Sequence, residues 1–74
     1  MEIFAERLRA LRVENKFSMK MLAEKIGTSD VAINNWENKI NEPKISYLYR
    51  LAKVLNVSSD YLIGLEDEDG TKSE

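Results

Sequence analysis

Residues 18–39 read SMKMLAEKIGTSDVAINNWENK, a stretch that predicts two short helices joined by a tight turn. The first half carries an apolar row at helical spacing, formed by Met21, Leu22, Ala23 and Ile26. Gly27 then supplies a residue that can adopt positive φ without a Cβ penalty, so the chain is expected to reverse there. Ser29 is a suitable N-cap for the second helix, to about residue 38, in which Ile33 and Trp36 form an inward edge. The rest of the chain is expected to pack around this pair of helices.

One further helix is predicted before this pair. It covers residues 2–15, is amphipathic and has about four turns. Its apolar row, spaced at four and three residues, is formed by Phe4, Leu8 and Leu11. After the pair, residues 39–43 form a connection that Pro43 stiffens, and Ile40 is expected to turn inward from it.

Two more helices are predicted beyond this connection. The fourth helix covers residues 44 or 46 to 55, and Asn56 follows it as a residue that tolerates a left-handed cap. The apolar row of this helix is formed by Ile45, Leu48, Leu51, Ala52 and Leu55. Ser58 is a suitable N-cap for a short fifth helix that ends at Gly64.

The chain length of 74 residues fits one domain with a single modest core. We assign residues 1–65 to this domain. Residues 66–74 contain only charged and small polar side chains, so they are predicted to be an acidic, disordered tail. No stretch approaches the roughly 18 apolar residues of a membrane span. The amino terminus lacks a secretory pattern, so we expect a soluble cytoplasmic protein with no membrane partner.

The composition excludes several kinds of active site. The sequence contains no cysteine and no histidine, which removes thiolate and imidazole metal ligands and the catalytic pairs that use them. The serine, lysine and carboxylate side chains show no arrangement of a nucleophile with its base. We therefore expect neither an enzyme nor a bound cofactor, metal or small-molecule ligand.

The net charge of −2 combines two unlike segments. Residues 1–65 hold ten lysines and arginines against eight acidic residues, whereas residues 66–74 hold one lysine against five acidic residues. The predicted domain is therefore mildly basic. Since the sequence pI is about 5.2, any surface that attracts phosphate must be local.

Four motifs along the chain read ERLRALR, LAEKIGTSDVAINNWENK, EPKI and LAKVLNVSSDYLIG, and together they span about residues 2–65. They resemble the DNA-binding domain of phage repressors of the Cro and CI type, also called XRE-type helix-turn-helix regulators. The resemblance implies an all-α, compact five-helix lambda-repressor-like domain. It also implies that the second helix of the motif lies in the major groove while the first braces against the DNA backbone.

Two positions depart from the family pattern. Met19 stands where the family usually has glutamine, and a thioether has almost no capacity to form the hydrogen bonds of an amide. Asp30 stands where arginine or a small polar residue is common. Its carboxylate can support the start of the helix or accept from the amino group of a cytosine, and both interpretations remain open.

The face of the second motif helix opposite its inward edge is short, polar and uncharged. Asparagine can pair with the adenine edge, and valine can pack on a thymine methyl group, so this face suits the reading of bases. The predicted base-reading residues are Asp30, Val31, Asn34, Asn35 and Asn38. The alternative is a merely solvated helix face, because asparagines on a helix prove nothing alone.

Contacts to phosphate require cations or N–H donors beside the recognition helix. Candidates occur at the start of that helix, at the start of the helix before it and in the loop after it. They are Lys20, Thr28, Ser29, Lys39, Asn41 and Lys44. Any single lysine among them is equally well explained as an ordinary solvated residue.

The family resemblance further implies an ion pair between Arg12 of the first helix and Glu37 beside the tryptophan, with a structural role. At the other end of the domain, four apolar residues can form a homodimer contact: Tyr61, Leu62, Ile63 and Leu65. An isologous contact there would present two recognition helices to successive major grooves. Alternatively, Leu62 simply closes the core.

These features favour a sequence-specific regulator that binds double-stranded DNA, most simply a repressor acting as a homodimer on a palindromic operator. The main alternative is a protein-interaction module of the same fold, such as an antitoxin-like or adaptor component. The acidic total charge and the methionine at position 19 favour that alternative.

Overall fold

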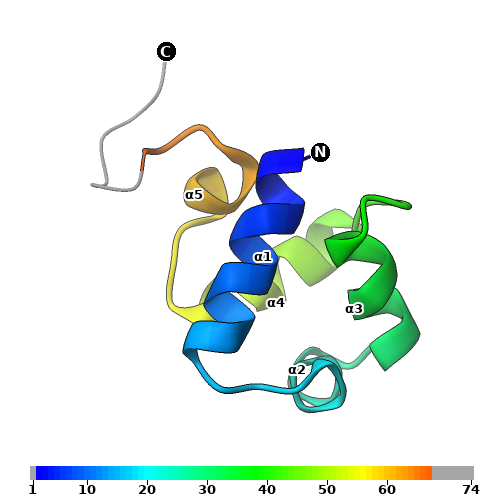
Figure 1. Ribbon diagram of the computed structural model, residues 1–74. Helices are drawn as coiled ribbons and strands as arrows, with labels where there is room; N and C mark the ends of the chain where they lie inside the picture. The colour runs from blue at the N-terminus through cyan, green and yellow to red at the C-terminus, as the bar shows by residue number, and fades with distance from the viewer. Residues whose placement is uncertain (1, 68–74) are drawn as a thin grey trace.

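A computed structural model describes residues 2–67, and five helices make up most of this part of the chain (Figure 1). They are α1 (Glu2–Glu14), α2 (Met19–Ile26), α3 (Asp30–Glu37), α4 (Ile45–Leu55) and α5 (Ser59–Ile63). Their order matches the five predicted helices, with bounds within one residue or so. Met1 and residues 68–74, which include most of the predicted tail, lie outside the described residues. No helix within residues 2–67 has the length and apolar character needed to cross a bilayer.

Three serines begin helices, as the sequence predicts. Ser18, Ser29 and Ser58 precede α2, α3 and α5, and each hydroxyl accepts a hydrogen bond from the backbone N–H three residues later. The three distances are 3.0, 3.1 and 2.9 Å. Each bond satisfies a donor that the helix itself leaves unpaired, and a cap of this kind typically contributes about 1 kcal/mol.

Each helix is followed by a residue in the left-handed conformation. The N–H of the next residue then reaches back to the carbonyl five positions earlier, over 2.8 to 3.0 Å. The predicted ends at Gly27, Asn56 and Gly64 are confirmed, and these residue types tolerate that backbone. Lys16 and Lys39 hold the same conformation after α1 and α3, with φ of 60° and 64°. Lysine gives no such signal in a sequence.

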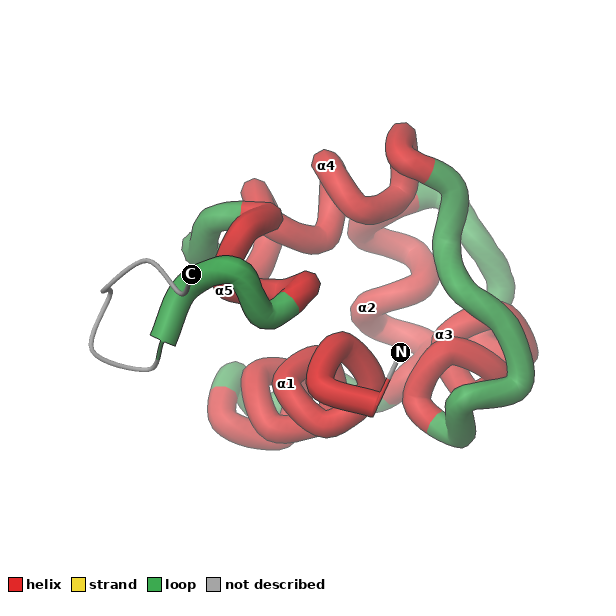
Figure 2. The backbone as a smooth tube through the Cα atoms, turned by 90° about the horizontal axis from the view of Figure 1, so that it is seen from above, coloured by secondary structure: helices red, strands yellow, loops and turns green. Residues whose placement is uncertain are grey.

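The helices surround a single core. α1 packs against α3 and α5, whereas α4 packs against α2 and α5, so α1 and α4 lie on opposite sides of the core (Figure 2). α2 and α3 complete it at one end. The main cluster of buried apolar side chains draws on all five helices and consists of Phe4, Leu8, Leu22, Ala23, Ile26, Ile33, Trp36, Leu51, Ala52, Leu55 and Leu62.

The apolar row of α2 differs from the predicted one at a single residue. Met21 is 45% exposed, and Met19 packs against the core in its place. The buried members of the row are Leu22, Ala23 and Ile26. Positions 19, 22, 23 and 26 follow the i, i+3, i+4, i+7 spacing of one helix face, and Met21 falls outside that spacing.

Two other residues predicted to face inward lie at the surface. Ile40 is 66% exposed, because it follows the left-handed Lys39 where the chain leaves α3. Ile45 is 84% exposed although it shares a helical face with Leu48 and Leu55. It begins α4 and borders a surface hollow, so no other element covers it.

Two arginines connect helices that are distant in the sequence. Arg7 of α1 donates to the backbone carbonyls of Tyr61 and Glu66, and its guanidinium lies 4.1 Å from the centroid of the Tyr61 ring. Arg50 of α4 donates to the carbonyl of Ile26 at the end of α2, over 3.0 Å. The contacts of the fold therefore extend to Glu66, one residue past the predicted domain boundary.

Candidate nucleic-acid interface

The recognition helix predicted from the sequence, α3, is fixed along one face and open along the other. Ile33, Trp36 and Glu37 of α3 are buried. The Trp36 ring packs against Tyr47 of α4 with ring centroids 5.7 Å apart. Gly27, with φ of 80°, turns the chain between α2 and α3. In Figure 1 α3 lies at the edge of the molecule, so its opposite face is presented outward.

The start of this outer face forms a shallow hollow together with the start of α2. Val31 is 63% exposed, and Asp30 and Asn34 are also exposed. These three residues line a hollow of about 270 Å³ with Met19 of α2. The structure thus brings three predicted base-reading residues together with Met19, the methionine that replaces the glutamine usual in the family. The spacing of Met19 to Leu22 could have indicated this position.

The other two predicted base-reading residues lie differently. Asn35 is only partly exposed. Asn38 is exposed but follows the last residue of α3, where its side-chain Nδ2 donates to the backbone oxygen of Asn34 at 2.8 Å and to Asn34 Oδ1 at 3.0 Å. Asn38 therefore caps the helix and orients the Asn34 amide, a role that the sequence did not indicate.

The predicted phosphate contacts occupy both ends of the motif. Lys20 is exposed in the first turn of α2, beside the hollow. Thr28 is half-buried, and the Ser29 hydroxyl oxygen accepts the capping bond, so its O–H and the backbone N–H groups at the start of α3 remain as donors there. Three exposed residues follow α3 in the loop to α4: Lys39, Asn41 and Lys44. Lys39 Nζ also lies 3.9 Å from Glu2 Oε1, in an exposed pair.

An ion pair joins α1 to the far end of α3, between the two residues that the family resemblance indicated. Arg12 Nε donates to Glu37 Oε2 over 2.6 Å and Arg12 Nη2 to Glu37 Oε1 over 3.0 Å, a bidentate arrangement. Arg12 Nη1 also donates to the Phe17 carbonyl over 3.0 Å. The two side chains are 12% and 1% exposed. The hydrogen bond with Glu37 raises the pKa of Arg12, which keeps the guanidinium protonated.

The predicted dimer contact must be corrected at one residue. Leu62 is fully buried and packs in the core between α5 and its neighbours, so it cannot meet a second chain. Tyr61 and Ile63 are partly buried, and Leu65 is 50% exposed. The sequence pattern did not separate these residues, because a helix of five residues has too few turns to define a face.

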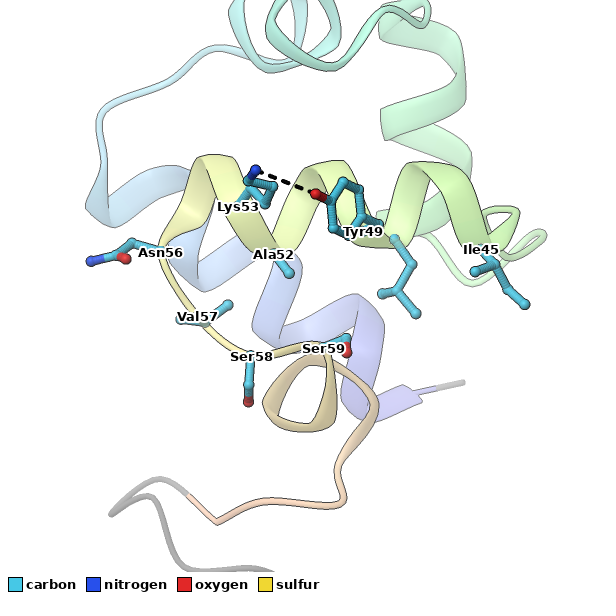
Figure 3. A pocket seen from close by; sticks show the side chains of 9 residues that line it. Ile45, Tyr49, Ala52, Lys53, Asn56, Val57, Ser58 and Ser59 are labelled. Atoms are coloured by element: carbon cyan, nitrogen blue, oxygen red, sulfur yellow. Dashed lines mark hydrogen bonds between the residues drawn. The ribbon is translucent and has the colours of Figure 1, made fainter.

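A larger hollow of about 640 Å³ lies along α4 and the loop to α5 (Figure 3). Ile45 and Tyr49, both exposed, line it beside Lys53, whose Nζ lies 3.3 Å from the Tyr49 hydroxyl. None of the lining residues comes from α2 or α3. Residues 45, 49 and 53 are spaced by four, so the sequence could have indicated an exposed stripe here.

Comparison with known proteins identifies the fold and its class. A family model described as helix-turn-helix matches residues 8–62. The uncharacterized HTH-type transcriptional regulator YobD of Bacillus subtilis (strain 168) is 38% identical over 72 residues, which are 97% of this chain and 64% of YobD. Repressor protein C2 of Salmonella phage P22 is 39% identical over 62 residues, which are 84% of this chain and 29% of that repressor. The chain thus spans less than two thirds of the length of either relative.

A solved structure supports the same assignment. The crystal structure of the P22 c2 repressor in complex with a synthetic operator superposes with a TM-score of 0.79 at 39% identity. The superposition covers 84% of this chain and 94% of the repressor chain. The predicted five-helix lambda-repressor-like fold is therefore confirmed, and the family is one of DNA-binding transcription regulators, not of enzymes. The chain belongs to the Cro/CI-type, or XRE, helix-turn-helix family.

Proposed function

We propose that this chain is a sequence-specific transcriptional regulator, a repressor that places α3 in the major groove of a palindromic operator. The observation that carries the proposal is the outer face of α3. It is exposed and built from short side chains, while Arg12 and Glu37 hold the opposite face in place. The relationship to a repressor crystallised with its operator supports it.

Base reading is assigned to the outer face of α3. Val31 offers methyl groups that can pack on a thymine methyl, and Asn34 and Asn35 offer amides that can pair with the adenine edge. Asn38 restrains the Asn34 amide, so this side chain loses less freedom on binding. Because the Arg12–Glu37 ion pair holds α3 against α1, the helix can present these side chains to the bases without rearrangement.

Backbone contacts are assigned to the ends of the motif. The N–H groups at the start of α3, beside Thr28 and Ser29, are suited to a phosphate oxygen. Lys20 lies on the α2 side, and the loop after α3 supplies Lys39, Asn41 and Lys44. These contacts would fix the register of α3 without carrying sequence information.

A palindromic operator requires two copies of this chain. We assign the contact between protomers to the surface that Tyr61, Ile63 and Leu65 leave at the end of the domain. The distance between half-sites, about one helical turn of DNA, then follows from the geometry of the dimer. A regulator of this kind is expected to act in the cytoplasm.

A selection experiment tests the proposal. Binding of the full chain to a pool of random duplexes should enrich a sequence with two related half-sites, and its affinity should fall steeply as salt rises. The double variant Asn34→Ala, Asn35→Ala should lose discrimination between the enriched duplex and a scrambled one while its melting temperature stays near that of the wild type. Asn15→Ala is the matched control, because Asn15 is an exposed asparagine whose amide bonds only within α1.

The alternative function, a protein-interaction module, is favoured by one observation. The hollow along α4 is bordered by exposed Ile45 and Tyr49, which is the kind of apolar surface that binds protein. Failure to enrich any duplex, together with the absence of a salt dependence, would favour this function over DNA recognition.

A further inference from the structure

The hollow at the start of α2 and α3 combines apolar and charged side chains within the proposed interface. Met19 comes from α2, and Asp30, Val31 and Asn34 come from α3. The inference below rests on the proposed function, because it concerns what this hollow would meet in a major groove.

Two of the lining side chains are apolar and come from different helices. Met19 is partly buried, packs against the core and lines the hollow from α2. Val31 is exposed and lines the hollow from α3. Neither side chain can form a strong hydrogen bond to a base or phosphate. The flexible, polarisable thioether adapts to small apolar groups, so this pair suits a methyl group.

The third lining side chain is a carboxylate, which favours the start of α3 by its charge but is not needed as its cap. The Ser29 hydroxyl already fills the capping position of α3, by accepting from Ala32 N–H. Asp30 is exposed at the first position of the helix and lines the hollow. An ionised carboxylate only accepts hydrogen bonds, so it favours the N4 amino group of cytosine and opposes the O4 oxygen of thymine.

We propose that this hollow reads pyrimidines in the major groove by two features at once, a C5 methyl group and a neighbouring amino donor. Met19 and Val31 contact the methyl group, and Asp30 accepts from the cytosine amino group. The two features occur together on 5-methylcytosine, and they also occur where a thymine is followed or preceded by a cytosine. Met19 is then a specificity-determining residue, in place of the amide that the family usually carries there.

Methyl substitution in the operator tests the inference. In the enriched duplex each thymine is replaced singly by deoxyuridine and each cytosine singly by 5-methylcytosine, and the dissociation constant of the full chain is measured. Burying one methyl group changes an affinity about fourfold. If one thymine per half-site loses affinity fourfold on replacement by deoxyuridine, the hollow reads a thymine beside a cytosine. If one cytosine gains affinity fourfold on replacement by 5-methylcytosine, the hollow reads 5-methylcytosine.

Variants assign the effect to the hollow. Met19→Gln should abolish the response to the methyl group, and Met19→Leu should keep it. Met21→Gln is the matched control, because Met21 is an exposed methionine of the same helix that does not line the hollow. Asp30→Asn should reduce the preference for the neighbouring cytosine over thymine by about tenfold. If Met19→Gln does not fold, Met19→Ala carries the same test, because it removes the thioether without burying a polar group.

The outcomes separate this inference from the proposed function. The inference is overturned if affinity for the enriched duplex responds to no methyl change. It is also overturned if the response is equal in the wild type and in a folded Met19→Gln variant. Neither outcome contradicts the proposed function as a regulator. Failure to enrich any duplex overturns both.

Discussion

We predict that replacing Lys39 with glycine stabilises the fold and weakens DNA binding at the same time. Lys39 follows α3 with φ of 64°, in the left-handed region that costs a residue with a Cβ roughly 1–2 kcal/mol. Glycine avoids this cost but loses about 0.5–1 kcal/mol through the greater freedom of the unfolded chain. The difference is a gain of about 0.5–1 kcal/mol in the free energy of unfolding.

The lysine side chain contributes little that would offset this gain. Its Nζ lies 3.9 Å from Glu2 Oε1, and both side chains are exposed, at 46% and 82%. Exposed pairs of this kind contribute about 0–1 kcal/mol, and less as salt rises. For a domain of this size, a gain of 1 kcal/mol raises the melting temperature by about 4–8 °C.

Lys16→Gly is the matched control for this prediction. Lys16 follows α1 with φ of 60°, so glycine relieves the same backbone cost there. Lys16 is not among the predicted phosphate contacts. Both variants should therefore melt higher than the wild type, but only Lys39→Gly should lower DNA affinity and reduce the slope of log affinity against log salt by about 1.

Thermal unfolding followed by circular dichroism measures the first effect, and fluorescence anisotropy of a labelled operator across a salt series measures the second. A lower melting temperature for both variants would refute the cost assigned to the left-handed lysines. Equal salt slopes for the two variants would refute the phosphate contact at Lys39 and leave the stability argument intact.

Three further predictions concern the stability of the fold. Arg12→Ala should lower the free energy of unfolding by about 3–5 kcal/mol, because the Glu37 side chain, 1% exposed, is left without its cation; an unchanged melting temperature would show that the pair has no structural role. Leu62→Ala should cost about 2–5 kcal/mol in urea unfolding, since Leu62 is fully buried; weakened self-association at unchanged stability would instead place Leu62 at a contact between protomers. Gly64→Ala places a Cβ 2.8 Å from Ile3 Cγ2 at φ of +89° and should cost about 1–2 kcal/mol, and wild-type stability would mean that this turn relaxes without strain.

Most of the helical framework could be predicted because its signals are local. Ser18 and Ser29 mark helix starts through their own hydroxyls, and Gly27 marks a turn through its missing Cβ. The left-handed Lys16 and Lys39 could not be predicted, since their conformation is imposed by the hydrogen bonds that end each helix and not by the lysine side chain.

The structure places the predicted base-reading residues on or directly after α3, and it adds Met19 of α2 to the surface that they form. Helical spacing from Ile33 and Trp36 predicted the polar face of α3. The spacing could not show that the Asn38 amide donates to Asn34, because that bond depends on where α3 ends. Likewise, comparison with the family pattern indicated only that Met19 lacks the hydrogen bonds of the usual glutamine. Its spacing to Ile26 places it on the core face of α2, beside the hollow.

The positions of the arginines explain how an acidic chain can bind DNA. Three of the four arginines, Arg7, Arg12 and Arg50, donate hydrogen bonds within the fold and hold helices together, whereas Arg9 is exposed on α1. The proposed phosphate contacts then depend on lysines 20, 39 and 44 and on N–H groups at the start of α3. Three such cations correspond to a salt slope of roughly −3 per protomer, which is modest for an operator-binding protein. With so small a nonspecific contribution, more of the binding free energy must come from the base edges that α3 meets, and a low pI then favours selectivity by weakening attachment to unrelated DNA.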